Sequence, residues 1–234
     1  MWKIKNLYSM KTDKFHIDSP KEYWDHRFKS EDWGTNGRIQ TLEYAKANLK
    51  SIGLSSDFNG SVLDFGCALG DAVAIYSNAF PNAKLLGVDI SEAAIEKCRE
   101  KYGDKAEWLC VNYTNIPFAD VIIASHVMEH IIDDKVVINA LIKKCSDLFV
   151  FVPYKENPLY FEHVHSYNEF SYKDLNVFEQ KIFKVSFKTK NRWTSVLKIL
   201  LKTFRFELYN NFTKDIIMFH FKGMQTSGAN RTSK

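Results

Sequence analysis

From residue 61 onward, short apolar runs alternate with amphipathic segments, and this alternation limits the possible folds more than any other feature. Strands buried on both faces of a sheet read as continuous apolar runs, as these do. A repeated strand–helix order predicts an α/β protein with a mostly parallel sheet and helices on both faces. The predicted strands are 61–65, 84–90, 106–111, 119–125 and 147–154, with closing strands at 182–190 and 214–223; the helices between them are 70–80, 91–103 and 133–145.

Two further helices are predicted before residue 55. Ser19 and Pro20 have the residue types of a helix start, and a second helix runs from about Arg38 to Ser51 with Gly53 as its stop. Ser171 and Asp174 predict one more helix start after the fifth strand. The expected organisation is a helical cap over 1–55, one α/β domain over 56–222 with a basic helical insertion at about 191–205, and a flexible tail over 223–234.

Composition excludes several classes of protein. No apolar run approaches the roughly 20 residues that span a bilayer, and the N-terminus lacks a signal-peptide core, so a cytoplasmic protein is expected. The four cysteines form no C-x-x-C pair and are interpreted as free thiols. A formal charge of +4 is compatible with an anionic small molecule and gives no reason to expect nucleic acid as a partner.

The first strand runs into a turn of small residues that begins at Asp64 and Gly66, and the second strand ends at Asp89. Small residues let a ligand approach the backbone, and a carboxylate at the second strand tip can accept hydrogen bonds from ribose hydroxyls. A dinucleotide site would need glycines at positions 66, 68 and 71, where the chain has Gly66, Ala68 and Asp71. The charge of Asp71 would also oppose a pyrophosphate.

Asp64, Gly66, Ala68 and Gly70 resemble the D-x-G-x-G-x-G motif of class I S-adenosylmethionine-dependent methyltransferases, with Ala68 in place of the middle glycine. The segments 112–118 and 126–130 resemble the D-A-x-x-L-P-F and V-L-E-H segments of that family. The resemblance covers about residues 60–155. It implies a Rossmann-like fold, S-adenosyl-L-methionine as cofactor, and Asn112 as the acceptor of a hydrogen bond from the adenine amino group.

Tyr23, Trp24, Arg27 and Phe28 resemble the helix that covers the cofactor in several small-molecule methyltransferases. This resemblance implies that Arg27 pairs with the methionine carboxylate; the alternative is a surface arginine on an amphipathic helix. The predicted cofactor-binding residues are Trp24, Arg27, Asp64, Gly66, Cys67, Ala68, Gly70, Asp89, Ile90, Asn112, Tyr113 and Ser125.

Methyl transfer to a hydroxyl needs a base, and histidine is the natural one near neutral pH. The predicted catalytic residues are His126, after the fourth strand, and His163 and His165, which bracket one residue in the following loop and would share a direction in extended chain. The pair suits either a base with its orienting partner or two metal ligands. Glu129 and Glu162 could add carboxylates, but no spacing confirms a metal site, and none is predicted. His130 is expected to make a structural hydrogen bond.

The chain lacks the [DN]-P-P-[YF] segment of nucleobase amine methyltransferases and has Ala124 and Ser125 there, which argues against methylation of adenine in DNA or RNA. A small hydroxylated molecule is the expected acceptor, on the following resemblance. The short cap and the histidine-bearing aromatic loop resemble bacterial methyltransferases that modify sugars or nucleotide-linked precursors of surface polysaccharides. An N-methyltransferase on a small amine and a non-catalytic cofactor-binding relative stay open. The basic segment 188–205 reads as a solvated amphipathic helix, with a membrane surface or an anionic substrate as alternatives. The sequence leaves the oligomeric state open.

Overall fold

The computed structural model of this chain describes residues 20–30, 33–190 and 209–223. Its elements are α3 (Pro20–Lys29), α4 (Gly34–Ile52), β1 (Ser61–Phe65), α5 (Asp71–Ala79), β2 (Lys84–Asp89), α6 (Glu92–Tyr102), η1 (Gly103–Lys105), β3 (Glu107–Cys110), β4 (Ala119–Ser125), η2 (Met128–His130), α7 (Asp134–Ile142), β5 (Cys145–Pro153), β6 (Val177–Lys190) and β7 (Tyr209–Lys222).

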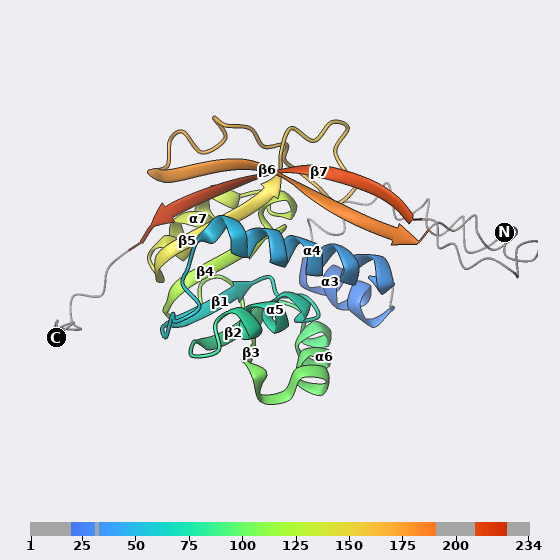
Figure 1. Ribbon diagram of the computed structural model, residues 1–234, viewed down its shortest axis with the longest axis vertical. Coiled ribbons are helices and arrows are strands. Elements are labelled where there is room, and N and C mark those ends of the chain that lie inside the picture. The colour runs from blue at the N-terminus through green and yellow to red at the C-terminus, as the bar shows by residue number, and fades with distance from the viewer. Residues whose placement is uncertain (1–19, 31–32, 191–208, 224–234) are drawn as a thin grey trace, which may run out of the picture.

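The strands form one seven-stranded sheet in the order β3-β2-β1-β4-β5-β7-β6 (Figure 1). Strands β1 to β5 are parallel, and β7 runs antiparallel to both β5 and β6. The predicted α/β, Rossmann-like, mostly parallel sheet is therefore confirmed. The chain order reverses between β1 and β4, so a crevice is expected outside the carboxyl ends of these two strands, where open α/β sheets bind ligands.

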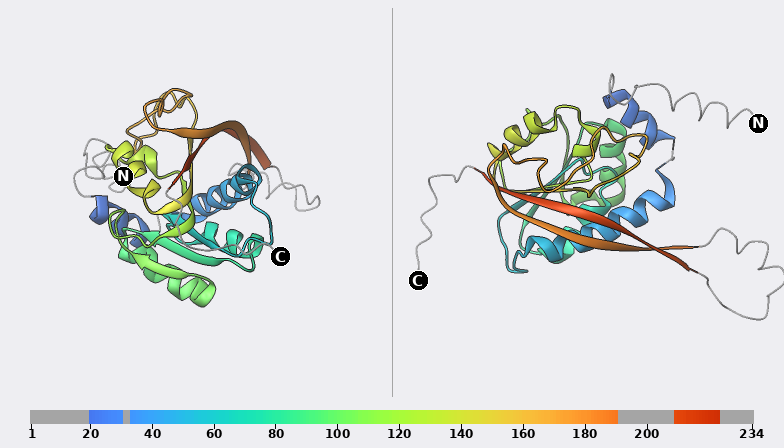
Figure 2. Two further views of the ribbon diagram at one scale, coloured as in Figure 1. Left: turned by 90° about the vertical axis from the view of Figure 1, so that its left-hand side faces the viewer. Right: turned by 90° about the horizontal axis from the view of Figure 1, so that it is seen from above.

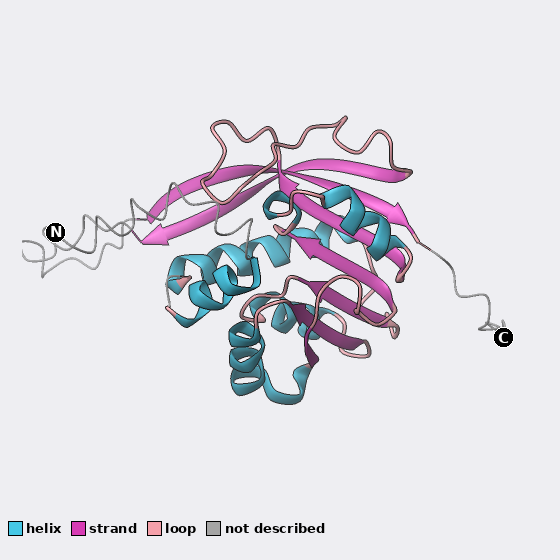
Figure 3. Cartoon of the chain, turned by 180° about the vertical axis from the view of Figure 1, so that it is seen from behind, coloured by secondary structure: helices cyan, strands magenta, loops and turns pink. Residues whose placement is uncertain are grey.

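Helices cover both faces of the sheet, as the sequence predicts (Figure 3). Successive residues of β1 point to opposite faces: Val62 joins the core that contains residues of α4, α5 and α6, and Leu63 joins the core that contains residues of α7. Tyr167 and Tyr172, from the loop after β5, complete the second core. Burial of apolar side chains on both sides explains why the strands read as unbroken apolar runs.

Several predicted helix ends are confirmed. Gly53 ends α4 with a left-handed φ of 69°, and the Ser91 hydroxyl caps α6 by accepting from the backbone N–H of Ala94 at 3.2 Å. Helix α4 begins at Gly34, earlier than the predicted Arg38. The segment that contains His126 does not open a helix directly: the short 3₁₀ turn η2 comes first, and α7 starts only at Asp134.

The helix predicted to start at Ser171 is wrong, because the chain makes turns there. The Ser171 hydroxyl accepts from the backbone N–H of Asn168 at 2.9 Å, which closes a local turn in place of a helix cap. Tyr167 and Tyr172 then donate to the same oxygen of the buried Asp134 carboxylate, at 2.9 and 2.7 Å. These long-range bonds attach the loop to α7 and override the local helix signal.

The closing strands are longer than the sequence predicts: β6 begins at Val177 and β7 at Tyr209. Figure 2 shows this antiparallel pair reaching well past the other strands. Most of the predicted basic segment 188–205, the insertion 191–205 and nearly all of the 223–234 tail lie outside the described residues, so those predictions stay predictions. Across the described ranges, each helix is too short or too polar to cross a membrane.

Candidate functional site

A cavity of about 570 Å³ opens at the carboxyl ends of β1, β2 and β4, the position predicted by the strand order. Cavities of a few hundred cubic ångströms are typical of sites for small molecules and cofactors. Its walls come from α3, α4, the turn after β1, the tip of β2, the segment after β4 and the loop after β5. The cavity is therefore assembled from most of the length of the chain.

The turn after β1 forms one wall of the cavity, and two of its residues with a left-handed φ, Gly66 and Ala68, line it. Gly66 has φ 75°, and a Cβ atom there would lie 2.4 Å from Cγ2 of Val127, so only glycine fits. Ala68, at the position of the family's middle glycine, has φ 47°, which costs a residue with a Cβ about 1–2 kcal/mol. The backbone N–H groups of Gly66 and Cys67 donate to the carbonyl of Val88, at 2.8 and 2.9 Å.

Asp89 ends β2, lines the cavity and is buried. Its Oδ2 accepts from the N–H of Ala68 and its Oδ1 from the N–H of Ser91, both at 2.9 Å. These bonds hold the carboxylate at the mouth of the turn, as its predicted role requires. Burial raises the pKa of Asp89 to about 6, an effect that the backbone hydrogen bonds reduce.

Asp64 lies in β1 and lines the same cavity. Burial, followed by the charge of Asp89, raises its pKa to about 7. Two buried carboxylates with raised pKa values favour a ligand that brings hydroxyl donors or positive charge, and they oppose a pyrophosphate. A ribose together with the ammonium and sulfonium groups of S-adenosylmethionine fits this requirement, whereas a dinucleotide does not.

Gly70 and Asp71 lie behind the turn and do not line the cavity. Gly70 has φ 75°, and a Cβ atom there would lie 2.8 Å from the ring of Trp108, so its role in this structure is close packing. The buried Asp71 carboxylate accepts from Lys101 at 2.8 Å and from Tyr102 at 2.5 Å. Arg38 of α4 adds a third contact at 3.1 Å, so Asp71 joins three helices.

Helix α3 covers one side of the cavity and supplies Trp24 and Arg27 to its lining. Arg27 Nε lies 3.1 Å from a carboxylate oxygen of the buried Glu162, and the Tyr23 hydroxyl donates to the same residue. The Asp25 carboxylate accepts from the Ser91 hydroxyl at 2.6 Å and fixes α3 to the start of α6. Arg27 is therefore a residue of the cavity wall with a protein carboxylate partner.

Of the other predicted cofactor residues, Cys67, Ile90, Asn112, Tyr113 and Ser125 all line the cavity. The Asn112 side-chain oxygen already accepts from the N–H and the hydroxyl of Thr114, at 3.0 and 2.6 Å. Both of its lone pairs are thus used by a local turn, and the amide NH₂ is the group left for a ligand. The Ser125 hydroxyl accepts from Asn48 of α4 at 2.9 Å.

His126 follows β4 and lines the cavity in a left-handed conformation, φ 56°. Its Nδ1 lies 3.0 Å from Oε1 of the fully buried Glu129, so Nδ1 carries the proton and Nε2 keeps a lone pair. Nε2 is buried and has no hydrogen-bond partner in the described part of the chain. The ring of Tyr44 packs against the imidazole at a centroid distance of 3.7 Å. A histidine oriented by a carboxylate in this way has the arrangement of a general base.

The predicted His163 and His165 pair is separated in the structure. His163 lines the cavity and its Nδ1 contacts the Glu156 carboxylate, whereas His165 is absent from the lining. His165 Nε2 lies 2.9 Å from the carbonyl of Ile131 and 3.0 Å from that of Ile132. The two rings therefore do not act as a pair: His163 lies on the cavity, whereas His165 fastens the loop to the segment before α7.

Two roles beside His126 were not predicted from the sequence. Glu129, named there only as a possible carboxylate for a metal, orients His126, and Tyr44 packs on it. Burial would raise the pKa of Glu129, but the hydrogen bond and charge of His126 together with the nearby imidazoles bring it below its ordinary value. Burial lowers the pKa of His130, whose Nδ1 makes the expected structural hydrogen bond, to the carbonyl of Glu162 at 3.1 Å. The three-residue spacing of His126 and Glu129 was the available sequence signal.

Residues 63–149 match the sequence model of a family described as a methyltransferase domain. This stretch contains the turn after β1, Asp89, His126 and Glu129. Over this stretch the chain is similar to a methyltransferase domain. A malonyl-[acyl-carrier protein] O-methyltransferase of Anoxybacillus flavithermus (strain DSM 21510 / WK1) is 36% identical over 53 residues, which are 22% of this chain and 20% of that relative. The chain thus aligns with only about a fifth of the length of this curated relative.

Solved methyltransferases share the fold over a larger part of the chain. The plantazolicin methyltransferase BpumL, in complex with SAH, matches with a TM-score of 0.53 and 15% identity, over 95% of this chain and 98% of that one. A precorrin-6y C5,15-methyltransferase from Geobacter metallireducens GS-15 matches with a TM-score of 0.50 and 10% identity, over 76% and 86% of the two chains. At these identities the similarity establishes the class I methyltransferase fold.

Proposed function

We propose that this methyltransferase-domain protein transfers a methyl group from S-adenosyl-L-methionine to a hydroxyl group of a small molecule. One observation carries the proposal: Asp64 and Asp89 line a single cavity at the point where the strand order reverses. The matched methyltransferase domain supports it, and so does the SAH named with the plantazolicin methyltransferase structure.

The residues present suit this methyl donor. Asp89 would accept hydrogen bonds from the ribose hydroxyls, and Asp64 with the turn at Gly66 would face the positively charged methionine end. Trp24 and Arg27 of α3 would cover the bound molecule. When bound, the sulfonium supplies both the methyl group and its own leaving group. The protein therefore has only to align the acceptor and to remove a proton.

His126 is the proposed general base. Its Nε2 would take the hydroxyl proton as the acceptor oxygen forms its bond to the methyl carbon and the carbon–sulfur bond breaks. Glu129 would hold the imidazole in the required tautomer and stabilise the imidazolium that forms. Among the three predicted catalytic histidines, His126 alone combines a position on the cavity with a carboxylate that orients it from within the core.

Sugars or nucleotide-linked precursors of a bacterial surface polysaccharide are the acceptor class that we propose. Tyr160 lines the cavity and lies 5.3 Å from His163 between ring centroids, where it would pack against the apolar face of a sugar ring. Tyr154 and Tyr167 do not line the cavity, and their hydroxyl groups donate to Glu169 and Asp134. A small amine is the competing acceptor, since an amine needs less help from a base.

Calorimetry with S-adenosylmethionine and with its demethylated product tests the donor site. We expect micromolar binding of both, and absence of heat with either would remove the proposal.

Turnover is then measured as release of demethylated product with nucleotide sugars, free sugars and amines. His126→Asn is the informative variant because asparagine tolerates a left-handed φ; we expect hydroxyl methylation to fall about 10²- to 10⁴-fold. His26→Ala, on the exposed face of α3, is the matched control. If His126→Asn methylates an amine as fast as the wild type does, the protein is instead an N-methyltransferase.

A further inference from the structure

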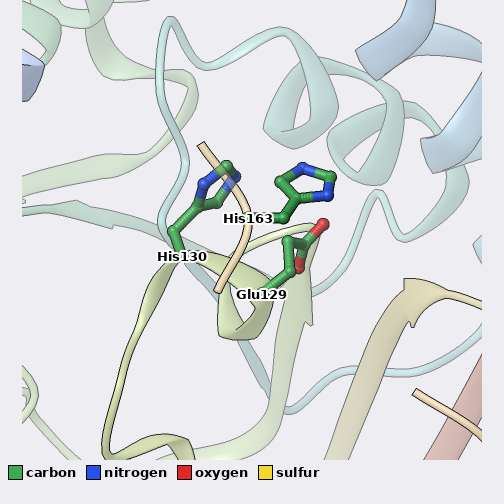
Figure 4. A group of neighbouring side chains, drawn as sticks. All are labelled: Glu129, His130 and His163. Atoms are coloured by element: carbon green, nitrogen blue, oxygen red, sulfur yellow. The ribbon is translucent and has the colours of Figure 1, made fainter. Parts of the chain in front are cut away.

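Three side chains that the proposed reaction leaves unassigned or uses only in part converge beside His126. Glu129 and His130 belong to η2 and His163 to the loop after β5, and one ligand atom from each lies within 4.8 Å of the other two. All three line the cavity. Figure 4 shows the Glu129 carboxylate pointing toward the ring of His163, with the ring of His130 beside them.

Each imidazole is oriented by a hydrogen bond made through its Nδ1. His130 Nδ1 lies 3.1 Å from the carbonyl oxygen of Glu162, and His163 Nδ1 contacts the Glu156 carboxylate. A carbonyl oxygen and a carboxylate can only accept a hydrogen bond. Each Nδ1 therefore carries the proton, and each Nε2 keeps a lone pair. Histidines that bind metals are oriented in this manner by a carbonyl or carboxylate.

The two oxygens of the Glu129 carboxylate have different surroundings. Its Oε1 pairs with Nδ1 of His126 at 3.0 Å, whereas Oε2 is buried without a hydrogen-bond partner in the residues that the structure describes. Glu129 is fully buried, and a carboxylate oxygen in such a place is costly unless a donor or a cation compensates it. A cation between Oε2 and the two imidazoles would supply this compensation.

We propose that Glu129, His130 and His163 bind one divalent transition-metal ion, with Zn²⁺ as the best match. Two imidazoles and a carboxylate suit zinc and its neighbours, whereas Mg²⁺ prefers oxygen ligands and water. Three protein ligands that leave one position open are typical of a catalytic zinc site. Ligand atoms at about 2.1 Å from a tetrahedral ion lie roughly 3.4 Å apart, so the three side chains close slightly on the metal.

The site deepens the proposed function and rests on it in one respect, the identity of the acceptor. Because all three ligands and His126 line the same cavity, an ion held there would be within reach of an acceptor oxygen bound beside His126. A metal at this position lowers the pKa of a coordinated hydroxyl. The acceptor class that fits is an alcohol with a second oxygen on the adjacent carbon, such as a sugar diol, because two neighbouring oxygens can chelate the ion.

The test is calorimetry of the full chain after treatment with a chelator, titrated with Zn²⁺, Mn²⁺ or Mg²⁺ in the absence of methyl donor. We expect one tight Zn²⁺ site per chain, weaker Mn²⁺ binding and no Mg²⁺ binding. Glu129→Gln and His163→Ala should each weaken Zn²⁺ binding at least about 10-fold. His165→Gln is the matched control from the same loop, because glutamine can still donate to the carbonyls of Ile131 and Ile132, and its Zn²⁺ affinity should equal that of the wild type.

Wild-type protein without stoichiometric Zn²⁺ binding, or variants with unchanged affinity, would overturn the metal site. Should Glu129→Gln fail to fold, His163→Ala decides alone, because His163 lies in a loop outside the regular elements. Donor binding is measured separately on the metal-free protein. Zn²⁺ binding without donor binding rejects the proposed function and keeps the metal site, and the reverse result rejects only the metal site.

Discussion

The backbone N–H of Ala68 donates to the Asp89 carboxylate at 2.9 Å, which joins the turn after β1 to the tip of β2. The two residues are distant in sequence, yet this bond fixes the left-handed φ of Ala68, 47°, and the direction of the carboxylate together. Both residues line the cavity. The turn and the acid therefore form one structural unit, and a substitution at either residue should change the position of the other.

Asp89→Asn should weaken S-adenosylmethionine binding about 10- to 100-fold, because a hydrogen bond to a charged acceptor contributes about 1.5–3 kcal/mol. Asparagine keeps the size of the side chain but loses one acceptor oxygen, either from the ligand or from Ala68 and Ser91. Calorimetry measures the affinity, and thermal unfolding shows whether the variant is folded. Asp57→Asn, at an exposed position, is the control. Wild-type affinity in Asp89→Asn would contradict the assignment of the ribose contact.

The buried Asp64 should make the protein less stable as the pH rises from about 4 to 7. Its pKa is raised from 3.8 to about 7, so in this range the native state binds more protons than the unfolded state. The free energy of unfolding then falls with increasing pH. Urea unfolding at about pH 4.5 and about pH 7.5 should show a smaller difference in stability for Asp64→Asn than for the wild type. If the free energy of unfolding changes with pH equally in the two proteins, the raised pKa of Asp64 is refuted.

Gly66→Ala should destabilise the protein by about 2–4 kcal/mol, from the left-handed backbone and from overlap with Val127. Adding Val127→Ala removes the overlap and leaves the backbone strain. We therefore expect a favourable coupling of about 1 kcal/mol or more between the two substitutions in a double-mutant cycle of chemical unfolding. Purely additive effects would mean that the contact at 2.4 Å has no energetic consequence.

Asp25→Ala should detach α3 from α6, because the carboxylate accepts from the Ser91 hydroxyl at 2.6 Å and the Ala93 N–H at 3.1 Å. Loss of such a capping interaction costs about 1–2 kcal/mol. Hydrogen exchange should quicken in α3, and donor affinity should fall because α3 carries Trp24 and Arg27. Glu22→Ala, an exposed neighbour on the same helix, should leave both unchanged. Slow exchange in α3 of Asp25→Ala would show that the aromatic packing of α3 alone holds the helix.

The sequence by itself determined the fold class, most of the strands and helices, and the acids at the ends of the first two strands. Each strand is an unbroken apolar run because it is covered on both sides, and each turn signal, such as Gly53 or Ser91, acts through its own backbone. Asp64 and Asp89 were found at the ends of two successive apolar runs, and the structure brings them together because the carboxyl ends of adjacent parallel strands meet at one edge. Strands, helix ends and short motifs depend on residues close together in the sequence or on the periodicity of apolar residues, so the sequence alone predicts them.

Only the tertiary structure decided how the polar side chains pair. The loop after β5 makes turns in place of a predicted helix because its tyrosines bond to Asp134, and this path brings His163 to the cavity and takes His165 away. The cluster of Glu129, His130 and His163 likewise depends on how that loop packs against η2. Loop conformation is set by long-range hydrogen bonds between side chains, and these leave no period or spacing in the sequence.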